Sequence, residues 1–110
     1  GEESVVGKSL HKDLEKGKLT LPLIHHLGVA SDRTRGQTLR LLESVAEHRA
    51  SPEAILQLAR AVHGTGSIEY ARATARRYVA TAKGALGVLS PSPALRVLTL
   101  LADAVVTRDQ

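Results

Sequence analysis

Residues 51–86 read SPEAILQLARAVHGTGSIEYARATARRYVATAKGAL, and this stretch decides the fold class. Ser51, Pro52 and Glu53 supply a helix cap, a proline at the first helical position and an acid in the first turn. Apolar residues then recur at steps of three and four, which is the period of an amphipathic helix. They are Ile55, Leu58, Ala59 and Val62. The pattern predicts a helix that ends near Gly64, where a glycine can adopt the left-handed conformation.

The second half of the stretch predicts the longest helix of the chain, over residues 68–87, with Ser67 as its cap. One face of this helix repeats apolar residues at the same spacing. These are Ile68, Ala71, Ala75, Tyr78, Val79, Ala82 and Leu86. Arg72, Arg76 and Arg77 lie largely off this face, and we interpret them as a solvated surface or one covered by another part of a larger protein.

Three further helices are expected outside the stretch. The first begins at Thr20 as N-cap with Pro22 in its first turn and ends near Gly28. The second runs from Ser31 or Asp32 to about Glu47, and the last covers 93–107 after the Ser90–Pro93 break. Their expected buried residues are Leu39, Leu42, Val45 and Ala46, and then Leu95, Leu98, Leu101, Ala102 and Val105. No stretch alternates with period two, so we predict an all-α domain with four or five antiparallel helices in 20–110.

The composition limits the possible functions. The chain has 110 residues, enough for one small domain, and no cysteine, which excludes disulfides and thiolate metal sites. The net charge is +4, but bases alternate with acids and the only aromatics are two tyrosines, so no nucleic-acid partner is expected. No apolar run is long enough for a membrane span, and no secretory leader opens the chain. We therefore expect a cytoplasmic protein.

The basic segment near the start carries the most specific motif. It contains Gly7-Lys8, then Asp13, then Gly17-Lys18, then Thr20-Leu21-Pro22. This spacing resembles the segment after the second aspartate-rich motif of the trans-isoprenyl diphosphate synthases, the polyprenyl synthetase family, in which position 11 is usually Gly rather than His11. GTGSIEYARATARRYVATAKGAL resembles the family's long Ala-rich helix. LADAVVTRDQ resembles its last helix, with Arg108 in the place of the terminal Arg.

The resemblance covers the whole chain and implies the C-terminal third of a medium- to long-chain synthase with the isoprenoid synthase fold. Such an enzyme condenses isopentenyl diphosphate with an allylic diphosphate. It needs Mg²⁺ held by aspartate-rich motifs, and these aspartates are absent from this chain. We therefore expect a fragment that is inactive alone, with no metal ligand and no catalytic residue of its own. Its apolar faces would lack their partners, so a homodimer is expected.

The resemblance also assigns roles within residues 1–19, which it implies to be a diphosphate-binding loop region. Lys8 is expected to contact the allylic diphosphate and Lys18 to lie near it. Asp13 is expected to orient a lysine or a metal-bound water. From charge alone, however, the segment could equally be a solvated surface, since residues 1–18 hold four acids and four lysines.

Two matters stay open from the sequence. His25 and His26 are adjacent and point to different sides of a helix, so they cannot both face one metal; packing or solvent exposure is the simpler interpretation. The alternative function is a non-catalytic helical module that binds a partner protein, such as an accessory subunit descended from a synthase. Upstream sequence with an aspartate-rich motif would favour the enzyme, and a start methionine without one would favour the module.

Overall fold

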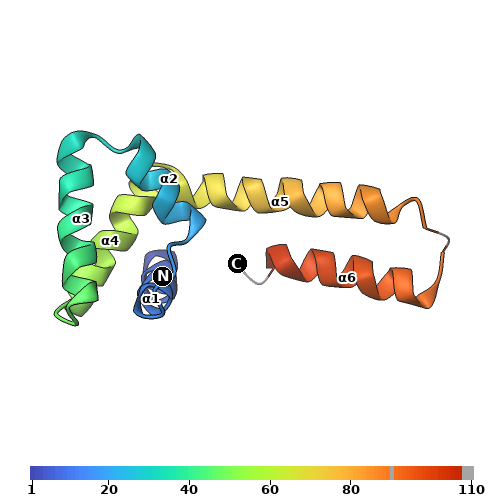
Figure 1. Cartoon of the computed structure of the whole chain (residues 1–110), viewed down its shortest axis with the longest axis horizontal. Helices are drawn as coiled ribbons and strands as arrows, with labels where there is room; N and C mark the ends of the chain where they lie inside the picture. Colours follow the sequence, from blue (N-terminus) through green and yellow to red (C-terminus); the bar gives the residue numbers. More distant parts are fainter. Residues whose placement is uncertain (90, 108–110) are drawn as a thin grey trace. The chain divides into compact units, whose positions relative to one another are not determined.

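The computed structural model describes residues 1–89 and 91–107, and these residues form six α-helices and no strand. The helices are α1 (Glu2–Glu15), α2 (Leu21–Val29), α3 (Asp32–Ala46), α4 (Pro52–Gly64), α5 (Ser67–Leu86) and α6 (Pro93–Thr107) (Figure 1). The all-α prediction is confirmed. Ser90 and Arg108, both named in the sequence analysis, lie outside the described residues.

The chain divides into two compact units, Gly1–Tyr70 and Ala71–Gln110. The first unit holds α1 to α4 and the first turn of α5, and it contains a buried core. Leu10 from α1, Leu23 from α2, Leu58 and Val62 from α4, and Ile68 from α5 make up this core. Four helices thus supply the core, and α3 packs against its edge through the partly buried Leu41 and Leu42.

Helix α4 forms as the sequence predicts. The Ser51 hydroxyl accepts a hydrogen bond of 3.1 Å from the Ala54 N–H, which satisfies one of the free donors at the helix start. All four predicted apolar residues are buried. The expected left-handed glycine is wrong by two residues, because Gly64 is the last helical residue and Gly66 (φ 71) takes the positive φ.

The most consequential difference lies at the N-terminus, where a loop was expected over residues 1–19 and the structure has helix α1. The physical reason is an apolar stripe at four-residue spacing, Val6, Leu10 and Leu14, which packs on the core of the first unit. Glu2 and Glu3 lie in the first turn, where acids favour a helix N-terminus. The basic segment is thus helical up to Glu15.

Two predicted stripe positions of α3, Leu39 and Ala46, are also wrong, because both are exposed. Leu39 is 50% exposed, while the neighbouring Thr38 is fully buried. The reason is a rotation of α3 by one position, which turns Thr38 and Val45 inward.

At α2, Thr20 occupies the N-cap position but makes no capping bond, and its Oγ1 is buried without a hydrogen-bond partner among the described residues. Pro22 removes one of the two N–H groups that such a cap normally engages.

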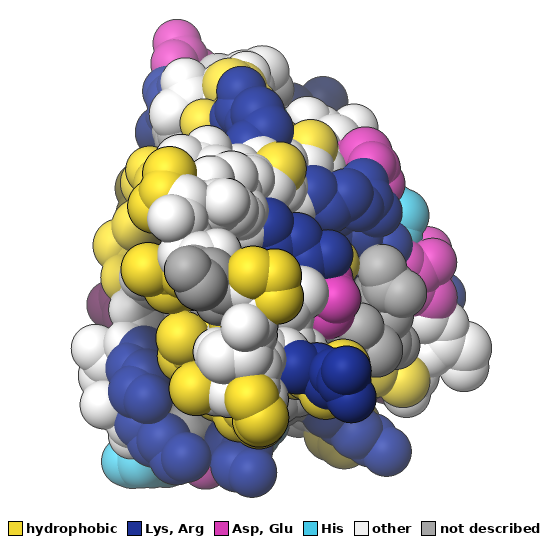
Figure 2. Space-filling model, turned by 90° about the vertical axis from the view of Figure 1, so that its right-hand side faces the viewer, with side chains coloured by type: hydrophobic (Ala, Val, Ile, Leu, Met, Phe, Trp, Pro, Cys, Tyr) yellow, Lys and Arg dark blue, Asp and Glu magenta, His cyan; other side chains and the backbone are white. Residues whose placement is uncertain are grey.

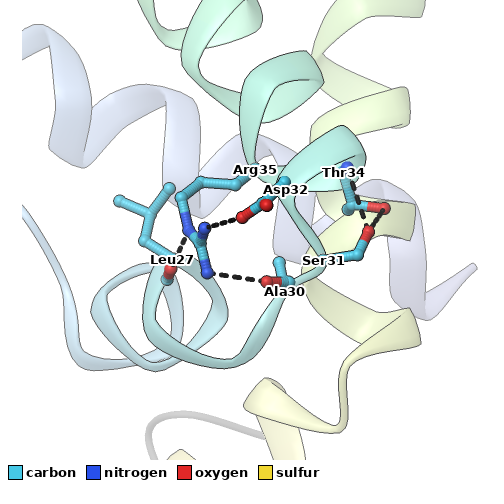
Figure 3. Close-up of polar contacts among 6 residues, drawn as sticks. All are labelled: Leu27, Ala30, Ser31, Asp32, Thr34 and Arg35. Carbon is cyan, nitrogen blue, oxygen red and sulfur yellow. Dashed lines mark hydrogen bonds and ion pairs between the residues drawn. The ribbon is translucent and has the colours of Figure 1, made fainter.

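Arg35 joins the end of α2 to the start of α3 (Figure 3). Its Nε donates to the carbonyl of Leu27 at 2.7 Å and its Nη2 donates to the carbonyl of Ala30 at 2.7 Å. Its Nη1 donates to Asp32 at 2.9 Å. The guanidinium fork thereby satisfies two carbonyl groups at the end of α2 that have no helical partner.

The second unit consists of the remainder of α5 and of α6, which run antiparallel and are joined by an ion pair between Lys83 and Asp103 (Figure 1). The apolar residues predicted to be buried here are not. Tyr78 is 73% exposed, and Leu98, Leu101 and Val105 are also exposed. Two helices alone lack the surface needed to cover both of their apolar stripes. Figure 2 shows hydrophobic side chains on the surface among Lys and Arg side chains.

Candidate functional site

Lys8 is the lysine of the basic segment that lines a hollow, which Glu3 also lines. The hollow has a volume of about 400 Å³ and lies in the first unit, between α1 and the start of α4. Its lining is mostly apolar, with Ile55 and Leu56 on α4 and Pro52 at the first helical position. His11 lines it one turn after Lys8. Cation and apolar wall together suit a ligand that is part anionic and part apolar.

The charge of Lys8 is not neutralised by an ion pair within residues 1–89 and 91–107. Among the described residues no ion pair reaches Lys8, although acids lie nearby. Glu3 is bound to Arg60 of α4 at 3.1 Å, and Glu15 is bound to His11 at 2.9 Å. These carboxylates thus have other partners, Arg60 and His11, and the exposed Lys8 ammonium is available to an incoming anion.

Gly7 explains how Lys8 comes to stand at this position. Gly7 is buried where α1 crosses α4, and a Cβ atom there would lie 3.3 Å from Ile55 Cγ2 and 3.4 Å from the Ile55 carbonyl oxygen. Only a residue without a side chain lets the two helices approach so closely. The glycine of this Gly-Lys pair sets the helix contact, and its lysine points to the surface beside it.

Gly17, in the second Gly-Lys pair, has a different role. It ends α1 with φ 73, donates to the Leu14 carbonyl at 3.0 Å, and is followed by Lys18, which donates to the Asp13 carbonyl at 2.8 Å. This pair of bonds is the Schellman motif, in which the left-handed residue is usually glycine. The motif fixes the direction in which the chain leaves α1 and hence the position of Lys18.

The structure places Lys8, Asp13 and Lys18 on one segment without joining their side chains. No ion pair connects the three among the described residues, and Asp13 meets Lys18 only through the backbone bond. Lys8 and the helix end at Lys16 are separated by about 12 Å along α1, at 1.5 Å per residue. Both lysines are exposed.

The structure also reveals a polar cluster around the two histidines, which the sequence analysis left unassigned. His26 is fully buried, with Nδ1 2.8 Å from Thr65 Oγ1 and Nε2 2.7 Å from Thr38 Oγ1. His25 Nδ1 lies 2.7 Å from Ser67 Oγ, and the ring stacks on Tyr70 with centroids 4.0 Å apart. Burial, and to a lesser degree the neighbouring His25, lowers the pKa of His26 below its ordinary value.

The contact between His25 and Ser67 has the spacing of a base and a nucleophile, but it is not a catalytic pair. Ser67 is fully buried, so no substrate reaches its hydroxyl. Its Oγ is also 2.8 Å from Thr65 Oγ1, which makes it one link in a structural chain of hydroxyls. A sequence signal for this cluster does exist, because Thr38 falls at the four- and seven-residue spacing of Leu42 and Val45.

No arrangement for a metal ion is found in the part of the chain that is described, where no three His, Asp or Glu side chains lie together. Nor is any helix among the described residues long and apolar enough to cross a membrane. The candidate site thus rests on two cationic groups of the described residues, Lys8 beside an apolar hollow and Lys18 after a fixed turn.

Known proteins similar to this chain are prenyl diphosphate synthases. The chain is 34% identical over 108 residues to a short chain isoprenyl diphosphate synthase of Methanothermobacter thermautotrophicus, which covers 98% of the chain and 32% of that protein. It is 32% identical over 104 residues to a geranylgeranyl pyrophosphate synthase of Geoglobus acetivorans, covering 94% of the chain and 30% of the relative. It is 32% identical over 105 residues to the octaprenyl diphosphate synthase of Escherichia coli, covering 96% of the chain and 31% of the relative.

These similarities confirm the family resemblance found in the sequence, whereas the medium- to long-chain type stays a prediction. The chain is related, over nearly its whole length, to a segment of the trans-isoprenyl diphosphate synthases. It spans about a third of the length of the curated relatives it matches, 32% in the first case. No family model and no solved structure matches the chain.

Proposed function

We propose that the chain is the C-terminal part of a prenyltransferase that condenses isopentenyl diphosphate with an allylic diphosphate and so extends a polyprenyl diphosphate. The proposal rests on the similarity to synthases over nearly the whole chain. The observation that carries it within the structure is Lys8, an unneutralised cation that lines an apolar hollow. An allylic diphosphate has the matching chemistry, an anionic head on an apolar chain.

The proposed role of Lys8 follows from the reaction. The bond between the allylic carbon and a diphosphate oxygen breaks, and the double bond of isopentenyl diphosphate attacks the resulting carbocation. The diphosphate has left in the first step with the electron pair of the broken bond, and the loss of a proton after the attack completes the product. Negative charge therefore grows on the leaving group, and a fixed ammonium beside it lowers the barrier. Lys8 would bind this diphosphate, at one edge of the hollow.

Lys18 is proposed to lie near the same diphosphate, with Asp13 behind it. Support for this comes from the Schellman turn, because Gly17 and the Asp13 carbonyl fix where Lys18 leaves the helix. The two lysines stand at different points of α1, so a single diphosphate would meet both only if its site extends along the helix.

Magnesium is proposed for the complete enzyme and not for this chain. The described residues do not gather the carboxylates that Mg²⁺ prefers, so the residues here do not fit a magnesium site. The aspartates that would hold it belong to the part of a synthase to which this chain does not correspond. The chain alone is therefore proposed to be inactive, and the lysines serve the leaving group without touching the metal's own ligands.

The exposed apolar side chains of the second unit support a multi-part assembly. Leu98, Leu100 and Leu101 of α6 are all exposed, which is unfavourable for a surface that meets only water. We propose that the other helices of the synthase cover this face, that the complete enzyme is a cytoplasmic homodimer, and that it is of the medium- to long-chain type.

Two measurements test the proposal: the sequence of the gene upstream of this chain, and the prenyltransferase activity of the whole gene product. The region upstream of Gly1 should encode an aspartate-rich motif, and the whole product should convert isopentenyl diphosphate and an allylic diphosphate into a longer prenyl diphosphate. The 110-residue chain alone should yield none. Upstream sequence with a start methionine and no such motif, or activity of the chain alone, would contradict the proposal. The former result would favour the non-catalytic helical module.

A further inference from the structure

A cluster of polar groups, of which His26, Thr38 and Ser67 are buried, lies where four segments of the first unit meet. It contains His25 and His26 of α2, Thr38 of α3, Thr65 in the turn after α4, and Ser67 and Tyr70 in the first turn of α5. Beyond Ile68, which packs in the core, these are the contacts that hold the start of α5 on the first unit. The cluster is independent of the lysine site and of the proposed function.

One arrangement of protons satisfies all the hydrogen bonds of the cluster, and it follows from the bond of Thr65 to a backbone carbonyl. Thr65 Oγ1 donates to the Val62 carbonyl at 3.1 Å, so its lone pairs accept from Ser67 and from His26. His26 consequently carries its proton on Nδ1, and its Nε2 accepts from the Thr38 hydroxyl. In this arrangement the Ser67 hydroxyl donates a hydrogen bond to Thr65 Oγ1 and accepts one from His25 Nδ1. This arrangement satisfies every group with a neutral His26.

We propose that this cluster is a proton-sensitive joint, which fixes the first turn of α5 to α2 while His26 is neutral and releases it when His26 takes up a proton. A second proton on His26 would enter at Nε2, where the Thr38 hydroxyl now donates. Thr38 would have to turn its own proton away, and the ring would become a buried cation. Such a charge is tolerated only when an acid pairs with it or when water reaches it.

The two side-chain hydrogen bonds of His26 in the described structure go to the hydroxyls of Thr65 and Thr38, which carry no charge to offset that cost. On α2 the neighbouring ionisable group is His25, whose charge acts against protonation of His26. On α3 the guanidinium of Arg35 is bound to Leu27, Ala30 and Asp32. On α4 His63 faces Glu2 of α1 at 3.9 Å, and on α5 Tyr70 is uncharged. No carboxylate bonds His26 among the described residues, so opening of the joint to water is the route to a charged ring.

The first turn of α5 is the part that opening would free. Its Tyr70 N–H donates to the Gly66 carbonyl at 3.0 Å, and the Tyr70 ring is held by the stack on His25. Loss of the bonds from Thr65 and Ser67 to the two histidines removes the polar contacts of this turn with α2. The Tyr70 amide is therefore a direct reporter of the state of the joint.

Hydrogen exchange measured by NMR on the 110-residue chain tests the proposal. The protection of the Tyr70 amide, corrected for intrinsic exchange, should fall about tenfold between pH 7.5 and 5.5, the factor for one proton taken up with an ordinary pKa of about 6.5 in the open state. The Ile55 amide, which donates to the Ser51 carbonyl at the start of α4, serves as an internal reference. It should lose much less protection over the same range.

Two variants separate His26 from the other histidines. His26→Gln cannot take up the proton and should show a flat Tyr70 protection, whereas His63→Gln, an exposed histidine on α4, should keep the tenfold fall. An unchanged fall in His26→Gln, or no fall in the unmodified chain, would overturn the proposal. If His26→Gln does not fold, the ring resonances of His26 decide. A titration at or above about 6.5 with full Tyr70 protection would refute the joint.

Discussion

Replacement of Gly17 by alanine is expected to destabilise the first unit by about 0.5–1 kcal/mol. Gly17 stands at φ 73 at the end of α1, where an L-residue pays about 1–2 kcal/mol for the left-handed conformation. The restricted unfolded chain of the alanine variant returns about 0.4–1 kcal/mol of this. The difference between these two contributions is the net loss of stability, and it arises in the turn that positions Lys18.

The end of α3 provides the mirror experiment, because it has the same motif with the opposite residue. His48 occupies the left-handed position at φ 58, donates to the Val45 carbonyl at 3.0 Å, and is followed by Arg49, which donates to the Ser44 carbonyl at 2.8 Å. His48→Gly should therefore stabilise the first unit by about 0.5–1 kcal/mol, because the relief of left-handed strain exceeds the cost of a more flexible unfolded chain.

Urea unfolding measures both changes. The chain has only two tyrosines and no tryptophan, so a Tyr78→Phe background leaves Tyr70 as the fluorophore of the first unit. Gly28→Ala is the matched control, because Gly28 is helical with open space around its Cα, and alanine there should stabilise by about 0.5–1 kcal/mol. Shifts of the same sign for Gly17→Ala and His48→Gly would refute the reasoning.

Three other substitutions or conditions have outcomes fixed by the same structure, each measured by urea unfolding. Arg35→Lys should cost about 1–2 kcal/mol, because one ammonium cannot reproduce the fork that holds two carbonyls, whereas loss of the exposed Asp32 should cost far less; equal losses would contradict the role of the fork. Leu58→Ala should cost about 2–5 kcal/mol at a fully buried site, against at most about 0.5 kcal/mol for Leu100→Ala, which is 62% exposed. Similar costs at the two sites would contradict the assigned core. Burial lowers the pKa of His26, so the unfolded chain binds more protons in acid, and the free energy of unfolding should fall below about pH 6.5 by at most about 1.4 kcal/mol per pH unit; a constant value from pH 7.5 to 5.5 would contradict it.

Much of the fold could be predicted from local patterns. Helix α4 has a cap, a proline at its first position and an apolar stripe that agree with one another, and all were confirmed. The bounds of α6 matched the predicted 93–107 for the same reason. Leu39 was assigned wrongly because its burial depends on a rotation of α3 by a single position. That rotation is set by contacts with α4, which a stripe on one helix does not contain.

Helix α1 was missed for a different reason. Its stripe of Val6, Leu10 and Leu14 is visible in the sequence, but four lysines and the family resemblance favoured a loop. Burial of the stripe outweighs the solvated lysines, since these can extend into water from a helix as well as from a loop. In the second unit the stripes of α5 and α6 were correctly seen as apolar, but their burial requires more helices than the chain contains.

The sequence identified individual residues of the candidate site, but it did not predict how these residues lie relative to one another. Spacing identified Gly7 and Gly17, and the structure gives each a separate physical reason, a close helix contact and a left-handed turn. The hollow beside Lys8 depends on how α1 crosses α4, which no local pattern specifies. The histidine cluster likewise joins residues about forty positions apart, such as His26 and Thr65.

The central claim is that Lys8 binds the diphosphate of an allylic substrate, and steady-state kinetics of the complete enzyme tests it most directly. Lys8→Ala should lower kcat/KM for the allylic diphosphate by about ten- to a hundredfold, the loss of one charge-assisted hydrogen bond of about 1.5–3 kcal/mol. Lys12→Ala, one turn further along α1 and outside the lining of the hollow, should change it less than about threefold, the effect of a solvated charge worth at most a fraction of a kcal/mol. Equal losses from the two substitutions would contradict the assignment of Lys8.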